Sequence, residues 1–152
     1  MPNCCSTEKP NSPDKVSVMD KSKIMIHRPD KDTVPDKILG TEKCCAKMYI
    51  KKLDDTRQVM RIEIDADFSW KDNIKPILPG CPDWCPATHF GYLESGEMEV
   101  EMKNGEICNI LAGDTYLVPP DHVPVFKKKT VMIEFIQDTT YTNKDFGKNE
   151  NN

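Results

Sequence analysis

The stretch EMEVEMKNGEICNIL, from Glu97 to Leu111, decides the fold class. In its first half Met98, Val100 and Met102 alternate with three glutamates, and a period of two puts the two sets on opposite faces of a β-strand. Asn104–Gly105 follows, and this pair accepts the positive φ angles of a type I′ turn. The stretch therefore predicts a β-hairpin with one buried face and one wet face.

Strand patterns continue on both sides of this hairpin. An earlier hairpin is expected from Cys44–Leu53 and Arg57–Asp65, which are joined by the turn-forming residues 54–56. Three later strands are expected, at Thr115–Val118, Val123–Phe126 and Val131–Ile136. About seven to nine short strands at this spacing, with no amphipathic helix of about ten residues, predict an all-β fold, either an antiparallel sandwich or a barrel.

The composition is that of one acidic domain. The chain has 152 residues, the size of a single domain, and a formal net charge of −4. Nucleic acid is not expected as a partner, because domains that bind it present a basic face. No run of about 18 apolar residues occurs, so no transmembrane segment is expected.

The N-terminal sequence and the cysteines together indicate the cellular compartment that we expect. Residues 1–19 lack the apolar stretch of a secretory signal, so we expect a cytoplasmic protein whose seven cysteines stay reduced. A disulfide between Cys81 and Cys85 is therefore not favoured. Cys4–Cys5 is a site where palmitate could attach, but no glycine follows Met1 to supply a second lipid signal. An inert pair of thiols is the preferred interpretation.

The chain divides into three parts. Residues 1–38 hold five of the twelve prolines and are predicted to be a flexible N-terminal arm. Within the arm, Lys23–His27 is expected to form a short strand that adds to a sheet edge, in the same chain or in the second chain of a homodimer. Residues 39–137 are expected to form the barrel, and residues 138–152 a polar C-terminal tail.

A second informative stretch, CPDWCPATHFGYLESG (Cys81–Gly96), lies directly before the hairpin. His89–Gly96 reads HFGYLESG and Gly113–His122 reads GDTYLVPPDH, and both follow the segment KPI at Lys75–Ile77. Together they resemble the patterns HxGYxxSG and GDxYxxPPxH of short, bacterial-type cupins, with a cysteine, Cys85, before the first pattern. The resemblance implies a single-domain, RmlC-like antiparallel jelly-roll barrel.

The resemblance also implies where metal ligands would stand. The ligand positions of the first cupin motif fall on Asp83, Cys85 and His89, which replace two histidines and a glutamate. The histidine of the second motif falls on Pro124, and His122 lies two residues earlier. Residues two or four apart on a strand share a face, so we expect all four candidates to point into the barrel. This set suits Zn²⁺ best, and Fe or Ni less well. A cavity without metal is the alternative.

The residues around these candidates are expected to line a pocket for a small molecule. They are Met98, Val100, Tyr92, Tyr116 and Trp84. The three aromatic residues have an alternative role, which is to pack in the core or cover a sheet edge.

Three functions fit these expectations. The first is a small cupin that binds a small molecule through a metal held by cysteine and histidine. The second is a metal-dependent enzyme, either an oxygenase by analogy with the family or a hydrolase or hydratase by ligand chemistry. The third is a non-catalytic interaction protein that uses its N-terminal arm. No residue is marked as catalytic by the sequence.

Overall fold

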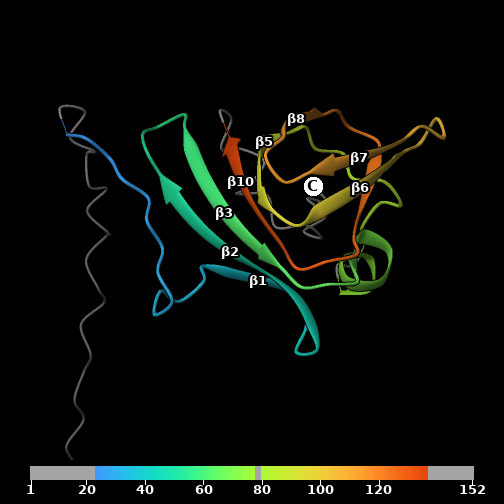
Figure 1. Cartoon of the computed structure of the whole chain (residues 1–152), viewed down its shortest axis with the longest axis horizontal. Helices are drawn as coiled ribbons and strands as arrows, with labels where there is room; N and C mark the ends of the chain where they lie inside the picture. Colours follow the sequence, from blue (N-terminus) through green and yellow to red (C-terminus); the bar gives the residue numbers. More distant parts are fainter. Residues whose placement is uncertain (1–22, 78–79, 137–152) are drawn as a thin grey trace, which may run out of the picture.

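The computed structural model of the protein describes residues 23–77 and 80–136. They form two antiparallel sheets that enclose the core (Figure 1). One sheet has the order β1-β2-β3-β10-β5-β8, and the other the order β4-β9-β6-β7. The strands are β1 (Lys37–Thr41), β2 (Cys44–Lys52), β3 (Gln58–Ile64), β4 (Phe68–Ser69), β5 (His89–Ser95), β6 (Glu97–Met102), β7 (Ile107–Leu111), β8 (Thr115–Val118), β9 (His122–Phe126) and β10 (Thr130–Ile136). Two helical turns, η1 (Trp70–Ile74) and η2 (Lys75–Ile77), follow β4.

Both expected hairpins are present. In β6 and β7, Glu97 pairs with Leu111, and Met98 and Val100 are buried. The expected type I′ turn is wrong, because the only positive φ in this described turn is the 90° of Gly105. The Gly105 N–H donates to the carbonyl of Met102. This hydrogen bond closes a type I turn that is followed by a glycine bulge. The prediction of an all-β antiparallel fold is confirmed.

The two sheets pack around a core of apolar side chains. The largest fully buried side chains are Phe126, Ile64, Leu93 and Thr130. Gly96 passes so close to Thr130 that a Cβ atom at Gly96 would lie 2.4 Å from the Thr130 hydroxyl oxygen, and its φ of 86° also favours glycine. We call Ile64, Leu93 and Phe126 the packed core.

The loop after β4 is held by side-chain hydrogen bonds. The Asp72 N–H donates to the Ser69 hydroxyl, which caps η1. Trp70 is buried, and its indole N–H donates to the carbonyl of Pro82 at 3.0 Å. These contacts fix the chain just before Cys85.

The segment before β1 differs from the prediction. Lys23–His27 is not a strand, although it runs beside β2 (Figure 1). A His27 ring nitrogen lies 3.0 Å from the carbonyl oxygen of Tyr49 on β2. The neighbouring backbone groups of β2 are already bonded to Asp36, whose N–H donates to Met48 and whose carboxylate accepts from the Ile50 N–H.

The predicted boundaries can be compared only in part. β1 begins at Lys37, two residues before the expected start of the barrel at 39. Pairing of two chains through Lys23–His27 stays a prediction. Cys4–Cys5 and the tail 138–152 lie outside the described residues. Over the described part of the chain, no helix is long and apolar enough to cross a membrane.

Candidate metal centre

Backbone hydrogen bonds tie Cys85 to His122. The Cys85 N–H donates to the carbonyl of His122 at 2.7 Å, and the Asp121 N–H donates to the carbonyl of Cys85 at 2.8 Å. Asp121 has a φ of 67°, so the chain turns sharply there before β9 begins at His122. The loop that carries Cys85 is therefore registered against the first residue of β9.

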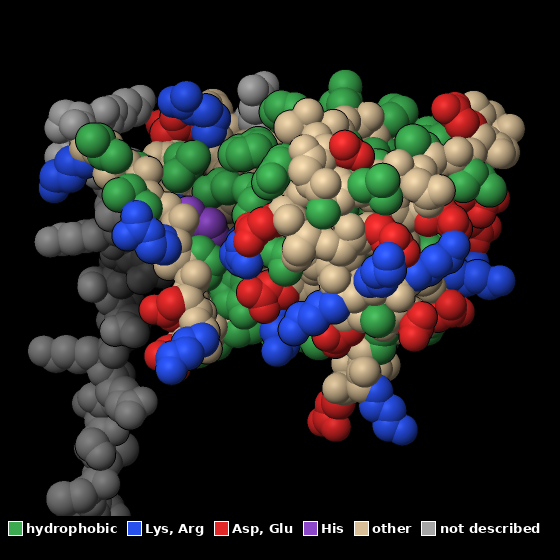
Figure 2. All heavy atoms as spheres, viewed as in Figure 1, with side chains coloured by type: hydrophobic (Ala, Val, Ile, Leu, Met, Phe, Trp, Pro, Cys, Tyr) green, Lys and Arg blue, Asp and Glu red, His purple; other side chains and the backbone are tan. Residues whose placement is uncertain are grey.

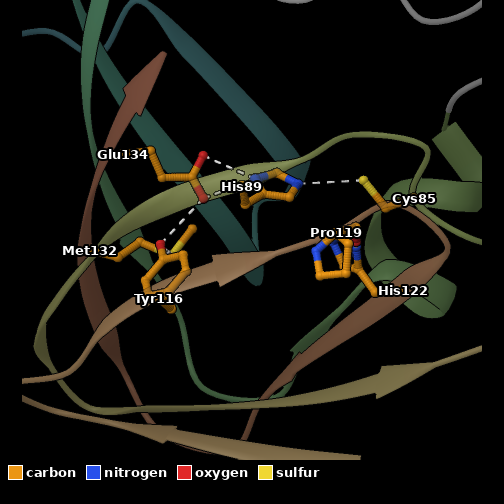
Figure 3. Close-up of polar contacts among 7 residues, drawn as sticks. All are labelled: Cys85, His89, Tyr116, Pro119, His122, Met132 and Glu134. Carbon is orange, nitrogen blue, oxygen red and sulfur yellow. Dashed lines mark hydrogen bonds and ion pairs between the residues drawn. The ribbon is translucent and has the colours of Figure 1, made fainter. Parts of the chain in front are cut away.

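His89 is the first residue of β5 and lies between Cys85 and Glu134 (Figure 3). Its Nδ1 atom is 2.9 Å and 3.0 Å from the two carboxylate oxygens of Glu134, and its Nε2 atom is 3.5 Å from the Cys85 sulfur. A carboxylate accepts hydrogen bonds, so Nδ1 carries a proton in this contact. In the neutral imidazole the lone pair is then on Nε2, which faces the sulfur.

His122 is oriented in the same way by a different acceptor. Its Nδ1 atom is 2.6 Å from the carbonyl oxygen of Pro119, which can only accept, so Nδ1 is the donor. The rings of His89 and His122 meet edge to face with centroids 5.0 Å apart. One donor atom from each of Cys85, His89 and His122 lies within 4.8 Å of the others. We call these three residues the thiol–histidine cluster.

The cluster is electrostatically coupled. Burial by itself would raise the pKa of the Cys85 thiol, but hydrogen bonds from His122 and His89 outweigh it and lower this pKa to about 6. Burial would lower the pKa of His89, but the charge of Glu134 and the contact with Cys85 raise it to about 10. Without a metal, Cys85 is therefore a thiolate and His89 an imidazolium near neutral pH.

Glu134 is a site residue that the sequence reasoning missed. It is buried on β10, and its carboxylate accepts from the Tyr116 hydroxyl at 3.3 Å. Burial and the charge of Glu134 raise the pKa of Tyr116, so that hydroxyl keeps its proton. A signal was present, because Glu134 stands between Met132 and Ile136 on the inward alternation of a predicted strand, where an unpaired carboxylate is costly.

The cluster opens into a cavity of about 770 Å³. Cys85, His89, His122 and Glu134 line it together with apolar side chains from β2 and β3, among them Met48, Ile50, Met60 and Ile62. A much smaller space of about 40 Å³ adjoins the two histidines and is lined by Met98 and Val100. The cluster and Glu134 are thus gathered in one part of a mostly apolar chamber, and Lys37 lines it from β1.

Comparison with known proteins identifies the fold. No protein-family model matches the sequence, and no curated protein matches it. Among solved structures, the chain is similar to an RmlC-like cupin from Shewanella frigidimarina NCIMB 400, with a TM-score of 0.50, 17% identity, and 78% of this chain and 96% of that chain covered. This chain has the cupin fold.

Two further structures are similar at lower scores. The EutQ protein of Clostridium difficile has a TM-score of 0.48 and 9% identity, with 64% of this chain and 71% of that chain covered. KdgF from Halomonas sp. has a TM-score of 0.45 and 18% identity, with 61% and 80% covered. The prediction of a cupin jelly roll is confirmed by the Shewanella structure.

Measured against the cupin positions, three of the four candidate ligands come together and one does not. Asp83 is exposed and forms an ion pair with Lys75, so its expected inward orientation is wrong. The physical reason is that residues 81–84 form a bent loop, to which the alternation rule for strands does not apply.

The expected pocket residues lie in different places, some in the interior and some at the surface. Tyr116 is buried against Glu134, whereas Tyr92 is 38% exposed on the outer side of β5, so its expected place in the pocket is wrong. Trp84 is half-buried and is not among the residues that line the large cavity, so its place in a pocket stays a prediction. Met98 and Val100 adjoin the two histidines.

Proposed function

We propose that this cupin holds a divalent metal at Cys85, His89 and His122 and binds a small, largely apolar molecule in the cavity beside it. The observation that carries the proposal is the orientation of the two imidazoles. Each histidine uses Nδ1 to donate to a fixed oxygen, one on Glu134 and one on Pro119. Metal-binding histidines in proteins are oriented by this kind of contact, which leaves Nε2 for the metal.

The spacing of the donor atoms supports the same proposal. Tetrahedral Zn²⁺ with sulfur at about 2.3 Å and nitrogen at about 2.0 Å needs donor atoms roughly 3.3–3.7 Å apart. The Cys85 sulfur and His89 Nε2 are already 3.5 Å apart, and the whole set lies within 4.8 Å. One thiolate and two imidazoles favour Zn²⁺, with Fe or Ni as alternatives.

The protein's own residues also favour loading. Cys85 has a lowered pKa, so its sulfur is charged near neutral pH, as a ligand must be. The proton on His89 Nε2 is the one that an incoming cation would displace, and Glu134 would keep the ring in place through Nδ1. When bound by three protein ligands, Zn²⁺ supplies Lewis-acid chemistry at its remaining position.

The test is the metal content of protein purified without an affinity tag. We expect close to one metal per chain, and less than about 0.1 per chain would contradict the proposal. Cys85→Ser, His89→Ala and His122→Ala should each lower metal content while the far-ultraviolet circular dichroism stays that of the wild type. Cys108→Ser is the matched control, because Cys108 is an exposed free cysteine outside the cluster.

A metal-dependent enzyme is the second candidate function. It is favoured by one observation, that all three donor residues line the same cavity, so a molecule there could approach the metal. Ligand chemistry points to a hydrolase or hydratase, whereas an oxygenase rests on analogy with the fold. Turnover of ester and hydratable substrates by wild type but not by His122→Ala would support it, and equal turnover by both would count against it.

A further inference from the structure

We propose that the molecule bound in the cavity is an apolar monocarboxylate, such as a medium-chain fatty acid, whose carboxylate pairs with Lys37 and whose apolar body extends toward the thiol–histidine cluster. This inference rests on the proposed function, because it names the ligand class of the same cavity. Three observations support it. Lys37 is a cationic side chain in the cavity wall, apolar side chains lie between Lys37 and the cluster, and the carboxylate of Glu134 is already paired.

Lys37 is the only lysine or arginine among the described residues that line the cavity. It is half-buried on β1 and has no ion-pair partner within residues 23–77 and 80–136. Over much of one face of the molecule, Lys and Arg side chains are interspersed with Asp and Glu (Figure 2). Lys37 therefore offers an unneutralised positive charge to the cavity of an acidic protein.

The strand register gives the path from Lys37 to the cluster. Lys37 pairs with Met48, Met48 with Ile62, and Ile62 with Met132. These residues line the cavity, and β10 pairs next with β5, which carries His89. Four strand spacings of about 4.8 Å separate β1 from β5 along the sheet, roughly 19 Å in all. The path begins at a cation and crosses only apolar side chains before it reaches the cluster.

The one carboxylate in the cavity wall is already paired and does not offer a charge to a cationic ligand. Glu134 is the one carboxylate in the lining, and it is already engaged by His89 and Tyr116. A cationic ligand would find no free counter-ion near its head group, and a neutral ligand would leave Lys37 unmatched. An anion with a long apolar body satisfies both parts of the wall.

Apolar side chains at the cavity rim extend the same surface. Phe90, Leu117 and Phe135 line the cavity but are 48%, 68% and 46% exposed. Phe90 and Phe135 are in contact, with ring centroids 6.0 Å apart. The body of a long ligand would cover part of these side chains, which a short polar acid would not do.

The test is calorimetric titration of the full-length protein with dodecanoate and with dodecanol, with metal content measured in the same samples. We expect dodecanoate to bind more tightly than dodecanol. Lys37→Met should weaken dodecanoate binding about tenfold to a hundredfold, which corresponds to the loss of a hydrogen bond to a charged group, and should change dodecanol binding less than about twofold. Lys37→Arg should retain most of the affinity.

Lys47→Met is the matched control. Lys47 precedes Met48 on β2 and is exposed on the opposite face of the same sheet, so dodecanoate affinity should not change. Unchanged dodecanoate affinity in folded Lys37→Met would overturn the inference, as would equal affinity for dodecanol in the wild type. Should Lys37→Met not fold, Lys37→Gln replaces it in the same comparison.

The result is separable from the fate of the metal. In Cys85→Ser we expect dodecanoate binding that still depends on Lys37, because the carboxylate of dodecanoate would lie at Lys37 and away from the cluster. Loss of dodecanoate binding in Cys85→Ser, with no effect of Lys37→Met, would put the carboxylate on the metal and overturn the inference. A metal-free wild type that binds dodecanoate through Lys37 would instead contradict only the proposed metal.

Discussion

The packed core and the thiol–histidine cluster occupy the same barrel but are held together by different forces. Ile64, Leu93 and Phe126 are stabilised by removal of apolar surface from water, which does not depend on pH. The cluster holds charged groups that are tolerated only because each has a partner. The difference separates a part of the barrel whose stabilisation is independent of pH from the part where we propose a metal.

The largest expected effect lies in the packed core. Phe126→Ala should lower the free energy of unfolding by about 3–5 kcal/mol, because it leaves a cavity between the sheets. Urea unfolding at pH 6 and at pH 8 should give the same loss. The control is Phe90→Ala, whose side chain is 48% exposed and should cost much less. A loss at Phe126 that changed with pH would remove the contrast between the two regions.

The next effect separates the cluster from the core by its pH dependence. In metal-free protein, Glu134→Gln should cost about 2–3 kcal/mol by removing the charge that faces the His89 imidazolium. The pKa of His89 is raised to about 10 from an ordinary 6.5. Its stabilisation is therefore complete below pH 6.5 and is lost as pH rises toward 10.

The difference in melting temperature between wild type and Glu134→Gln should follow that window. It should be largest near pH 6 and should shrink toward pH 10. A difference that stayed constant over this range would mean that Glu134 acts by packing alone, as a residue of the packed core would.

A smaller effect on stability, but a large one on ionisation, is expected at Cys85. Its pKa is lowered to about 6 from an ordinary 9, so in metal-free protein the thiolate absorbance lost in Cys85→Ser should titrate near pH 6. A midpoint above pH 8 would contradict the imidazolium contact. Taken alone, the lowered pKa stabilises the fold above pH 9, and this contribution is lost as pH falls toward 6.

The pH dependences of the two shifts nearly cancel around neutral pH, although both shifts stabilise the folded state there. From about pH 6.5 to 9, the folded pair keeps one proton on His89 and the unfolded pair keeps one on Cys85. Since both states hold the same number of protons, this pair should leave the stability of wild type nearly flat in that range.

The smallest effect is expected at Gln58. Its side-chain nitrogen is buried without a hydrogen-bond partner among the described residues. Gln58→Met keeps the shape of the side chain without an unpaired donor, so we expect a gain of about 1 kcal/mol in unfolding free energy. A loss of stability on urea unfolding would show that the rest of the amide makes a larger contribution than the unpaired nitrogen costs.

The parts of the molecule that the sequence predicts well are local. The hairpin at Glu97–Leu111 follows from alternation within one segment and a turn at its middle, and both are properties of neighbouring residues. Cys85, His89 and His122 were found through the spacing of the cupin patterns. The predicted inward orientation of Asp83 is wrong for a local reason as well. Asp83 lies in a loop, where side chains do not alternate between two faces as they do on a strand.

What the sequence did not predict depends on strands that are distant in the chain. Glu134 meets His89 because β10 pairs with β5, and no local pattern states that pairing. Lys37 enters the cavity because β1 extends the sheet beyond β2, although the composition of its neighbourhood resembles a flexible arm. The surroundings of both residues could be predicted only from the order of the strands in the sheet.

The backbone contact between Cys85 and His122 has a consequence for how a metal would be taken up. One main-chain hydrogen bond joins Cys85 to His122, and a second joins Cys85 to the neighbouring Asp121, so these two proposed ligands would act as a preformed bidentate chelator. The entropic cost of ordering those two ligands then falls on the folding of the barrel and not on the binding of the ion. Folding and metal loading should then be separate events, and a chelator should be able to empty the site of a barrel that remains folded.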